Sequence, residues 1–114
     1  MVRATLLTLA AAALLVAPAQ AKTAGLTGEV GPGFSIEVKK GNTDLKTIKA
    51  GTYKIKVEDK ASIHNFHLFG PGLNKKTGVG PKGTFTWTVT LKKGTYKYIC
   101  DPHAAIMKGS FKVT

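Results

Sequence analysis

The chain has 114 residues, with 17 Lys and Arg against 6 Asp and Glu, one Cys, one Trp and three His. This length fits one domain and excludes a large multidomain enzyme. The single cysteine excludes an intramolecular disulfide, a four-cysteine zinc site and an iron–sulfur cluster. The net charge of +11 indicates an acidic partner or surface. Because all but one of the basic residues are Lys, whereas nucleic-acid readers rely on Arg, we expect no nucleic-acid binding.

Residues 1–21 have the three parts of a secretory signal peptide. They begin with a positive charge at Arg3, continue with an apolar run over residues 5–16, and end in a small-residue cleavage site after Ala21. A membrane anchor needs about 20 apolar residues, so this run is too short to be one. We therefore expect a periplasmic or secreted mature domain, residues 22–114, without a membrane span.

The mature chain is divided by Gly and Pro about every ten residues, and the segments between them alternate apolar and polar side chains. Alternation with a period of two predicts β-strands with one face in the core. No segment has a convincing helical period. Short strands with regular turns predict an antiparallel sandwich or barrel. The expected strands lie at residues 34–38, 53–57, 63–69, 85–91, 96–100 and 111–113, and residues 70–83 are expected to form a connection.

Four residues form a candidate metal site. Cys100, His103 and Met107 lie within eight residues on an expected loop, and His64 opens an earlier strand. Each of these residues alone is more commonly a packing or surface residue. Together, two imidazoles, a thiolate and a distant thioether form the donor set of a blue-copper site, and sulfur ligands favour copper over hard ions.

His67 lies three residues after His64. In a strand, successive side chains point to opposite faces. His64, Phe66 and Leu68 would then share one face, and Asn65 and His67 the other. We therefore expect that His67 does not bind the same ion as His64.

The His64-Asn65 pair, the run Cys100-Asp101-Pro102-His103 and Met107 resemble the cupredoxin family, which includes the plastocyanin, azurin and amicyanin types. The resemblance extends over residues 34–114. It implies an all-β, Greek-key β-sandwich of about eight strands. It also implies one type 1 copper ion held by His64, Cys100 and His103 with Met107 as the axial ligand. Electrons would pass to a docked partner through His103, which we expect in an exposed apolar patch.

The residue after the cysteine departs from the family pattern. Family members usually have Thr or Ser at this position, whereas this chain has Asp101. Asp101 places a negative charge beside a metal whose potential depends on its surroundings.

The sequence contains no constellation that supports catalysis, so we expect a carrier and no enzyme. The first hypothesis is a monomeric one-electron carrier that uses Cu(II)/Cu(I) and docks on a redox protein with an acidic surface. The second is a copper-binding or copper-handling protein of the same fold without an electron-transfer partner. The third is a secreted interaction module without a metal. The alternating lysines alone do not decide the partner, since they also suit a solvated strand face and edges that resist aggregation.

Overall fold

The computed structural model describes residues 22–114, and the expected signal peptide lies outside the described residues. In this part of the chain, the backbone forms ten strands and one short 3₁₀-helix, η1 (Asp101–His103). The strands are β1 (Lys22–Val30), β2 (Ile36–Lys40), β3 (Thr43–Asp44), β4 (Thr47–Ile48), β5 (Gly51–Asp59), β6 (His67–Gly70), β7 (Leu73–Lys76), β8 (Gly83–Leu91), β9 (Gly94–Ile99) and β10 (Lys108–Val113).

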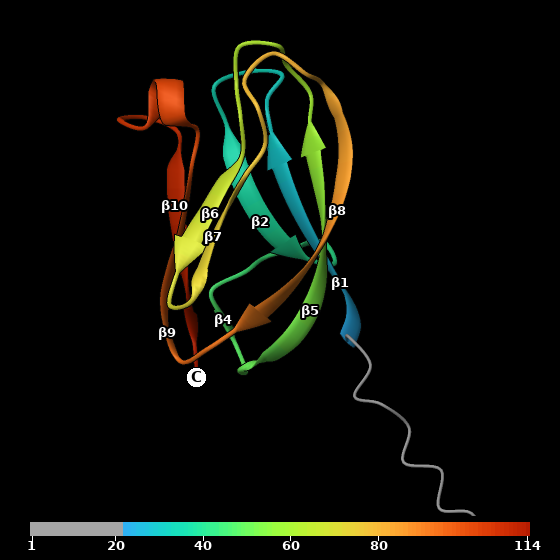
Figure 1. Ribbon diagram of the computed structural model, residues 1–114, viewed down its shortest axis with the longest axis vertical. Helices are drawn as coiled ribbons and strands as arrows, with labels where there is room; N and C mark the ends of the chain where they lie inside the picture. The colour runs from blue at the N-terminus through green and yellow to red at the C-terminus, as the bar shows by residue number, and fades with distance from the viewer. Residues whose placement is uncertain (1–21) are drawn as a thin grey trace, which may run out of the picture.

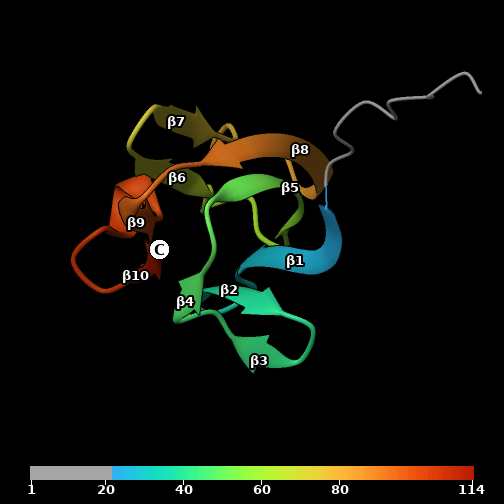
Figure 2. The same cartoon turned by 90° about the horizontal axis from the view of Figure 1, so that it is seen from below.

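The strands form two five-stranded sheets that pack as a sandwich (Figures 1 and 2). The strand orders are β3-β2-β1-β5-β8 and β4-β10-β9-β6-β7. Both sheets are mixed, because β1 pairs in parallel with β5 and β10 pairs in parallel with β4. The all-β class is confirmed. The ten strands exceed the expected number of about eight. Within residues 22–114, the expected antiparallel pairing is found in every other strand pair and is wrong for these two parallel pairs.

Alternate residues of the longer strands form the core. As the alternation predicted, Tyr53, Ile55 and Val57 of β5 are buried, whereas Lys54 and Lys56 between them are exposed. The same pattern places apolar residues of β8, β9 and β10 in the core: Val89, Leu91, Tyr96, Tyr98, Phe111 and Val113. The two sheets are therefore held together by the face that the sequence pattern identified.

Strand β1 was not predicted, because a glycine interrupts its apolar alternation. Leu26, Gly28 and Val30 all face the core. A Cβ atom at residue 28 would lie 2.6 Å from Cζ of Phe66, so the ring of Phe66 leaves no room for a larger side chain there. Leu26 and Val30 thus belong to one buried face whose middle position is necessarily glycine.

The region around β6 also differs from the prediction. The expected strand over residues 63–69 begins only at His67, and β7 occupies part of the expected connection. Ser62 and Ile63 form a turn before β6, and the His64 N–H donates to the Ala61 carbonyl at 3.5 Å. β7 lies at a sheet edge with mostly exposed side chains, so it lacks the alternation that reveals a half-buried strand.

Asp59, at the end of β5, makes stability depend on pH. Its side chain is 3% exposed, its Oδ1 accepts the Ala61 N–H at 3.1 Å, and its Oδ2 has no hydrogen-bond partner among the described residues. Burial raises the pKa of Asp59 above its ordinary value of 3.8, although the Ala61 N–H and His64 act in the opposite direction. The folded state therefore binds the proton more tightly than the unfolded state, and stability falls as pH rises through the folded-state pKa.

We expect Asp59→Asn to be more stable than the parent at neutral pH, by on the order of 1 kcal/mol, because it retains an acceptor for Ala61 and removes the buried charge. Urea unfolding from pH 3 to pH 8 measures this. The difference between variant and parent should grow as pH rises above about 4, near the ordinary pKa of an aspartate. A difference that is constant across this range would contradict the assignment.

Candidate metal centre

Three of the predicted ligands meet at one end of the sandwich. His64 lies between β5 and β6, Cys100 directly follows β9, and His103 ends η1. Figure 1 shows η1 at the end opposite the C-terminus. The Sγ of Cys100 lies 3.6 Å from Nδ1 of His64 and 3.5 Å from Nδ1 of His103, and the two Nδ1 atoms are 3.1 Å apart. These three donor atoms are close enough to bind a single ion.

The imidazole of His64 is oriented by a backbone carbonyl. Its Nε2 lies 2.9 Å from the carbonyl oxygen of Gly33. A carbonyl oxygen can only accept, so Nε2 carries the proton and, in the neutral ring, Nδ1 keeps a free lone pair. A hydrogen bond from the ring nitrogen that does not bind the metal is the usual way in which a protein orients a metal-binding histidine. His64 is fully buried, and the ring of Phe34 packs edge-on against both histidines.

Backbone hydrogen bonds close the loop that carries Cys100, His103 and Met107. The His103 N–H donates to the Cys100 carbonyl at 3.0 Å, and the Met107 N–H donates to the His103 carbonyl at 2.9 Å. The Cys100 N–H in turn donates to the Met107 carbonyl at 3.1 Å. Cys100 and Met107 are buried, whereas His103 is partly exposed. The loop thus brings Met107 back to the base of the loop, next to the cysteine.

Asn65 links the two segments that supply the ligands. Its Nδ2 donates to Oδ2 of Asp101 at 2.7 Å and to the Thr77 carbonyl at 3.2 Å, and its Oδ1 accepts the Asp101 N–H at 2.7 Å. The residue after His64 is therefore joined at two points to the residue after Cys100. Because these bonds involve protein groups only, they hold the pocket together without an ion.

His67 lies outside the group of three donors, as expected, although the reason differs from the predicted strand alternation. His64, Asn65 and Phe66 are all buried in the irregular segment that precedes β6. The ring of His67 instead points to Asp101, with Nδ1 2.8 Å from Oδ1. Burial raises the pKa of Asp101, but the hydrogen bonds from His67 and Asn65 and the charge of Lys76 outweigh it and leave that pKa below its ordinary value.

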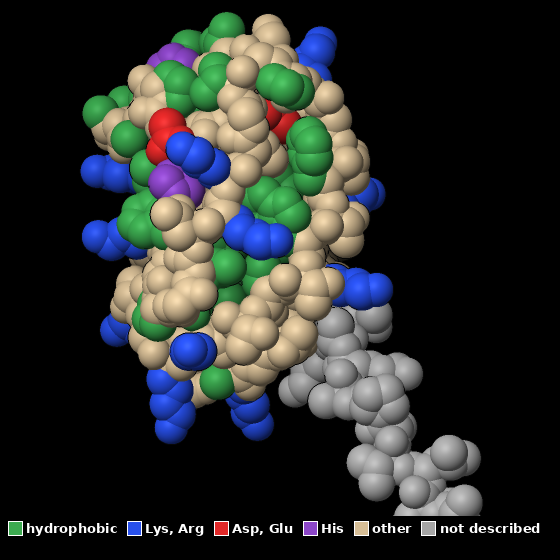
Figure 3. All heavy atoms as spheres, viewed as in Figure 1, with side chains coloured by type: hydrophobic (Ala, Val, Ile, Leu, Met, Phe, Trp, Pro, Cys, Tyr) green, Lys and Arg blue, Asp and Glu red, His purple; other side chains and the backbone are tan. Residues whose placement is uncertain are grey.

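The surface around His103 is apolar. The ring of Phe34, which is 60% exposed, lies 5.1 Å from that of His103, and Ile106 of the same loop is 67% exposed. Figure 3 shows hydrophobic side chains gathered at this end of the molecule, while most lysines of this face project from its sides and opposite end.

Sequence reasoning did not single out Gly33, Phe34 or Thr77 as parts of the site. Gly33 and Phe34 lie in the loop after β1, a strand that was not predicted. Thr77 follows β7, and its hydroxyl accepts the Phe66 N–H at 2.9 Å. Gly33 and Phe34 contact the ligand histidines, and Thr77 contacts Asn65 and Phe66 beside them. All three lie in segments distant in sequence from these partners, and no local motif marks them.

Comparison with known proteins agrees with this architecture. Residues 5–113 match the family model described as a cupredoxin-like domain. The chain belongs to the cupredoxin-like family. This cupredoxin is 38% identical over 90 residues to amicyanin-alpha of Methylorubrum extorquens, covering 72% of this chain and 74% of the relative. The family resemblance inferred from the ligand motifs is thereby confirmed.

The fold of this chain is similar to that of solved structures. A structure of the copper protein rusticyanin aligns with a TM-score of 0.58 at 25% identity, covering 78% of this cupredoxin and 76% of that chain. Dithionite-reduced auracyanin from Roseiflexus castenholzii aligns with a TM-score of 0.54 at 20% identity, covering 77% and 94%. Within residues 22–114, no helix is long and apolar enough to cross a membrane.

Proposed function

We propose that this cupredoxin is a one-electron carrier that binds one copper ion through His64, Cys100 and His103, with Met107 as the axial ligand. The observation that supports this best is the meeting of a thiol and two imidazole Nδ1 atoms at one point, with the other nitrogen of His64 engaged by Gly33. This donor set suits copper. When bound, copper supplies the Cu(II)/Cu(I) couple.

The protein's own part in this function is to hold the donors still. The side-chain amide of Asn65 joins the two ligand segments, because its Nδ2 donates to the Asp101 carboxylate and its Oδ1 accepts the Asp101 N–H, each at 2.7 Å. The Gly33 carbonyl keeps the ring of His64 in one orientation. A pocket that the protein holds in one shape changes little when an electron enters or leaves, and a small structural change favours fast transfer. We infer no catalytic step, since carriage of an electron requires none.

The partner is proposed to be a redox protein that docks over His103. The apolar residues Phe34 and Ile106 beside this histidine supply a dry contact, and the lysines around the body of the molecule favour a partner with an acidic docking surface. Similarity to amicyanin, rusticyanin and auracyanin favours the carrier hypothesis over that of a copper-handling protein without an electron-transfer partner.

We propose that the mature protein acts as a monomer in the periplasm or outside the cell, after cleavage of the signal peptide behind Ala21. The 16 lysines and six acidic residues of positions 22–114 give it a net charge of +10.

Voltammetry of the copper-loaded domain, residues 22–114, tests the proposal. We expect a reversible one-electron wave, with the zinc-loaded protein as a redox-silent control. An irreversible wave, or release of copper upon reduction, would instead favour the copper-handling alternative.

The positive charge leads to a separate prediction. The rate of electron transfer to an acidic redox protein should fall by roughly tenfold or more as salt rises, because salt screens long-range attraction. Stopped-flow measurements at increasing NaCl concentration check this, and reaction with an uncharged small-molecule oxidant is the control. A rate that does not depend on salt would mean that the lysines form only a solvated face.

A further inference from the structure

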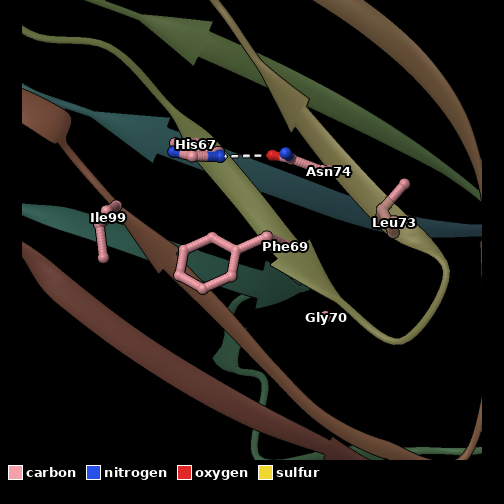
Figure 4. A pocket seen from close by; sticks show the side chains of 6 residues that line it. All are labelled: His67, Phe69, Gly70, Leu73, Asn74 and Ile99. Atoms are coloured by element: carbon pink, nitrogen blue, oxygen red, sulfur yellow. Dashed lines mark hydrogen bonds between the residues drawn. The ribbon is translucent and has the colours of Figure 1, made fainter.

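His67 and Asn74 form a hydrogen-bonded pair beside the proposed metal site. His67 opens β6, Asn74 lies on β7, and the two strands pair antiparallel. Nε2 of His67 lies 2.6 Å from Oδ1 of Asn74 (Figure 4), and Nδ1 lies 2.8 Å from Oδ1 of Asp101. Both ring nitrogens are therefore engaged, and His67 is held between the edge strand and the ligand loop.

Asp101 continues this chain of contacts toward the ligands. One carboxylate oxygen faces His67, while the other accepts from Nδ2 of Asn65 at 2.7 Å. The backbone N–H of Asp101 donates to Oδ1 of Asn65. Asp101 directly follows Cys100, and Asn65 directly follows His64. An unbroken series of side-chain contacts thus runs from Asn74 on the sheet edge to residues adjacent to two proposed ligands.

We infer that His67 and Asn74 are positioning residues, which hold the carboxylate of Asp101 and thereby set the Cu(II)/Cu(I) balance of the site. This inference rests on the proposed function. It assigns a role to the histidine that binds no ion and to the acidic residue that replaces the family's usual Thr or Ser.

The physical reason is charge compensation. A carboxylate on the residue that follows the proposed cysteine ligand favours the more positive ion, Cu(II), over Cu(I). The donors on Asp101 reduce this effect, because hydrogen bonds to both oxygens spread its charge and fix its direction. Without His67, one oxygen loses its protein donor, and the negative charge acts more strongly on the site. The side chains of His67 and Asp101 are 18% and 36% exposed, so water screens part of the effect.

Other charges near the carboxylate must stay constant in the test. Lys76 pairs across from His67 and also favours the charged form of Asp101. It is therefore kept in every variant. Phe69 offers a matched control, because its ring lies 5.0 Å from that of His67 but the contact is between rings and involves no hydrogen bond to Asp101.

The experiment compares His67→Ala, His67→Gln, Asn74→Ala and Phe69→Leu in the copper-loaded domain by voltammetry and visible absorption. We expect His67→Ala to keep the intense visible band and to shift the equilibrium toward Cu(II) by up to about tenfold, which is about 59 mV for a one-electron couple. His67→Gln restores one donor and should lie between His67→Ala and the parent. Asn74→Ala should shift the potential less and in the same direction, and Phe69→Leu should match the parent.

A second readout needs no metal. In the metal-free protein, hydrogen exchange of the Asp101 backbone amide should be faster in His67→Ala than in the parent, because its bond to Asn65 is less well supported. This readout still applies if the parent fails to bind copper, so failure of the proposed function and failure of this inference are distinguishable. An unchanged potential in His67→Ala, an equal shift in Phe69→Leu, or unchanged Asp101 exchange would each overturn the inference.

Discussion

Cys100→Ser is expected to abolish the intense visible absorption of the copper-loaded protein. The band of a blue-copper site arises from the bond between copper and a thiolate, and Cys100 is the only cysteine in the chain. A serine hydroxyl is a harder donor that stays protonated near neutral pH, so it does not replace the thiolate. Absorption spectra of parent and variant at equal Cu(II) loading measure the loss.

The control for this prediction is the fold of the variant. Cys100 is fully buried, and its N–H and carbonyl bond to Met107 and His103 through the backbone, which the substitution leaves in place. Thermal unfolding of the metal-free variant should therefore still be cooperative. A folded Cys100→Ser protein that kept the intense band would remove Cys100 from the proposed ligand set.

Substitutions of Met107 are expected to move the reduction potential in opposite directions. Met107 is 1% exposed, and its backbone closes the loop that carries Cys100 and His103. A thioether is a weak axial donor, so Met107→Leu should retain copper and colour while the potential rises. Met107→Gln supplies a harder oxygen donor that favours Cu(II), so the potential should fall. Each shift should be about 59 mV or more, a tenfold change in equilibrium.

Voltammetry of both variants, with absorption spectra to verify copper loading, measures these shifts. Two variants with the parent's potential would show that Met107 serves only as a packing residue at this end of the sandwich. Loss of copper from Met107→Leu would also be informative, because it would mean that the thioether contributes more to binding than a weak axial ligand does.

Much of the fold and the site could be predicted because the relevant signals are local in sequence. The alternation in β5 and β8 reveals a buried face within a few residues. Cys100, His103 and Met107 lie close together in sequence, between β9 and β10, so their donor set is visible as one local motif. The distant member, His64, was identified by its donor chemistry and its following asparagine. The structure then places its Nδ1 3.6 Å from the sulfur of Cys100.

The features that were missed depend on contacts between distant segments. β1 lacks clear alternation because Gly28 must make room for the ring of Phe66. The Gly33 carbonyl reaches His64 from the loop after that strand. The contact between His67 and Asp101 joins residues 34 positions apart, so the local sequence pattern could not show which group His67 contacts.

The most direct test of the account is to add Cu(II) to the purified domain, residues 22–114, and to record visible absorption and electron paramagnetic resonance spectra. Cys100, His64 and His103 predict binding of one ion per chain, an intense blue band, and the narrow copper hyperfine splitting of a strongly covalent copper–thiolate bond. The metal-free protein and the Cys100→Ser variant are the controls. A colourless complex with the wide hyperfine splitting of ordinary Cu(II) would contradict the proposed blue-copper centre.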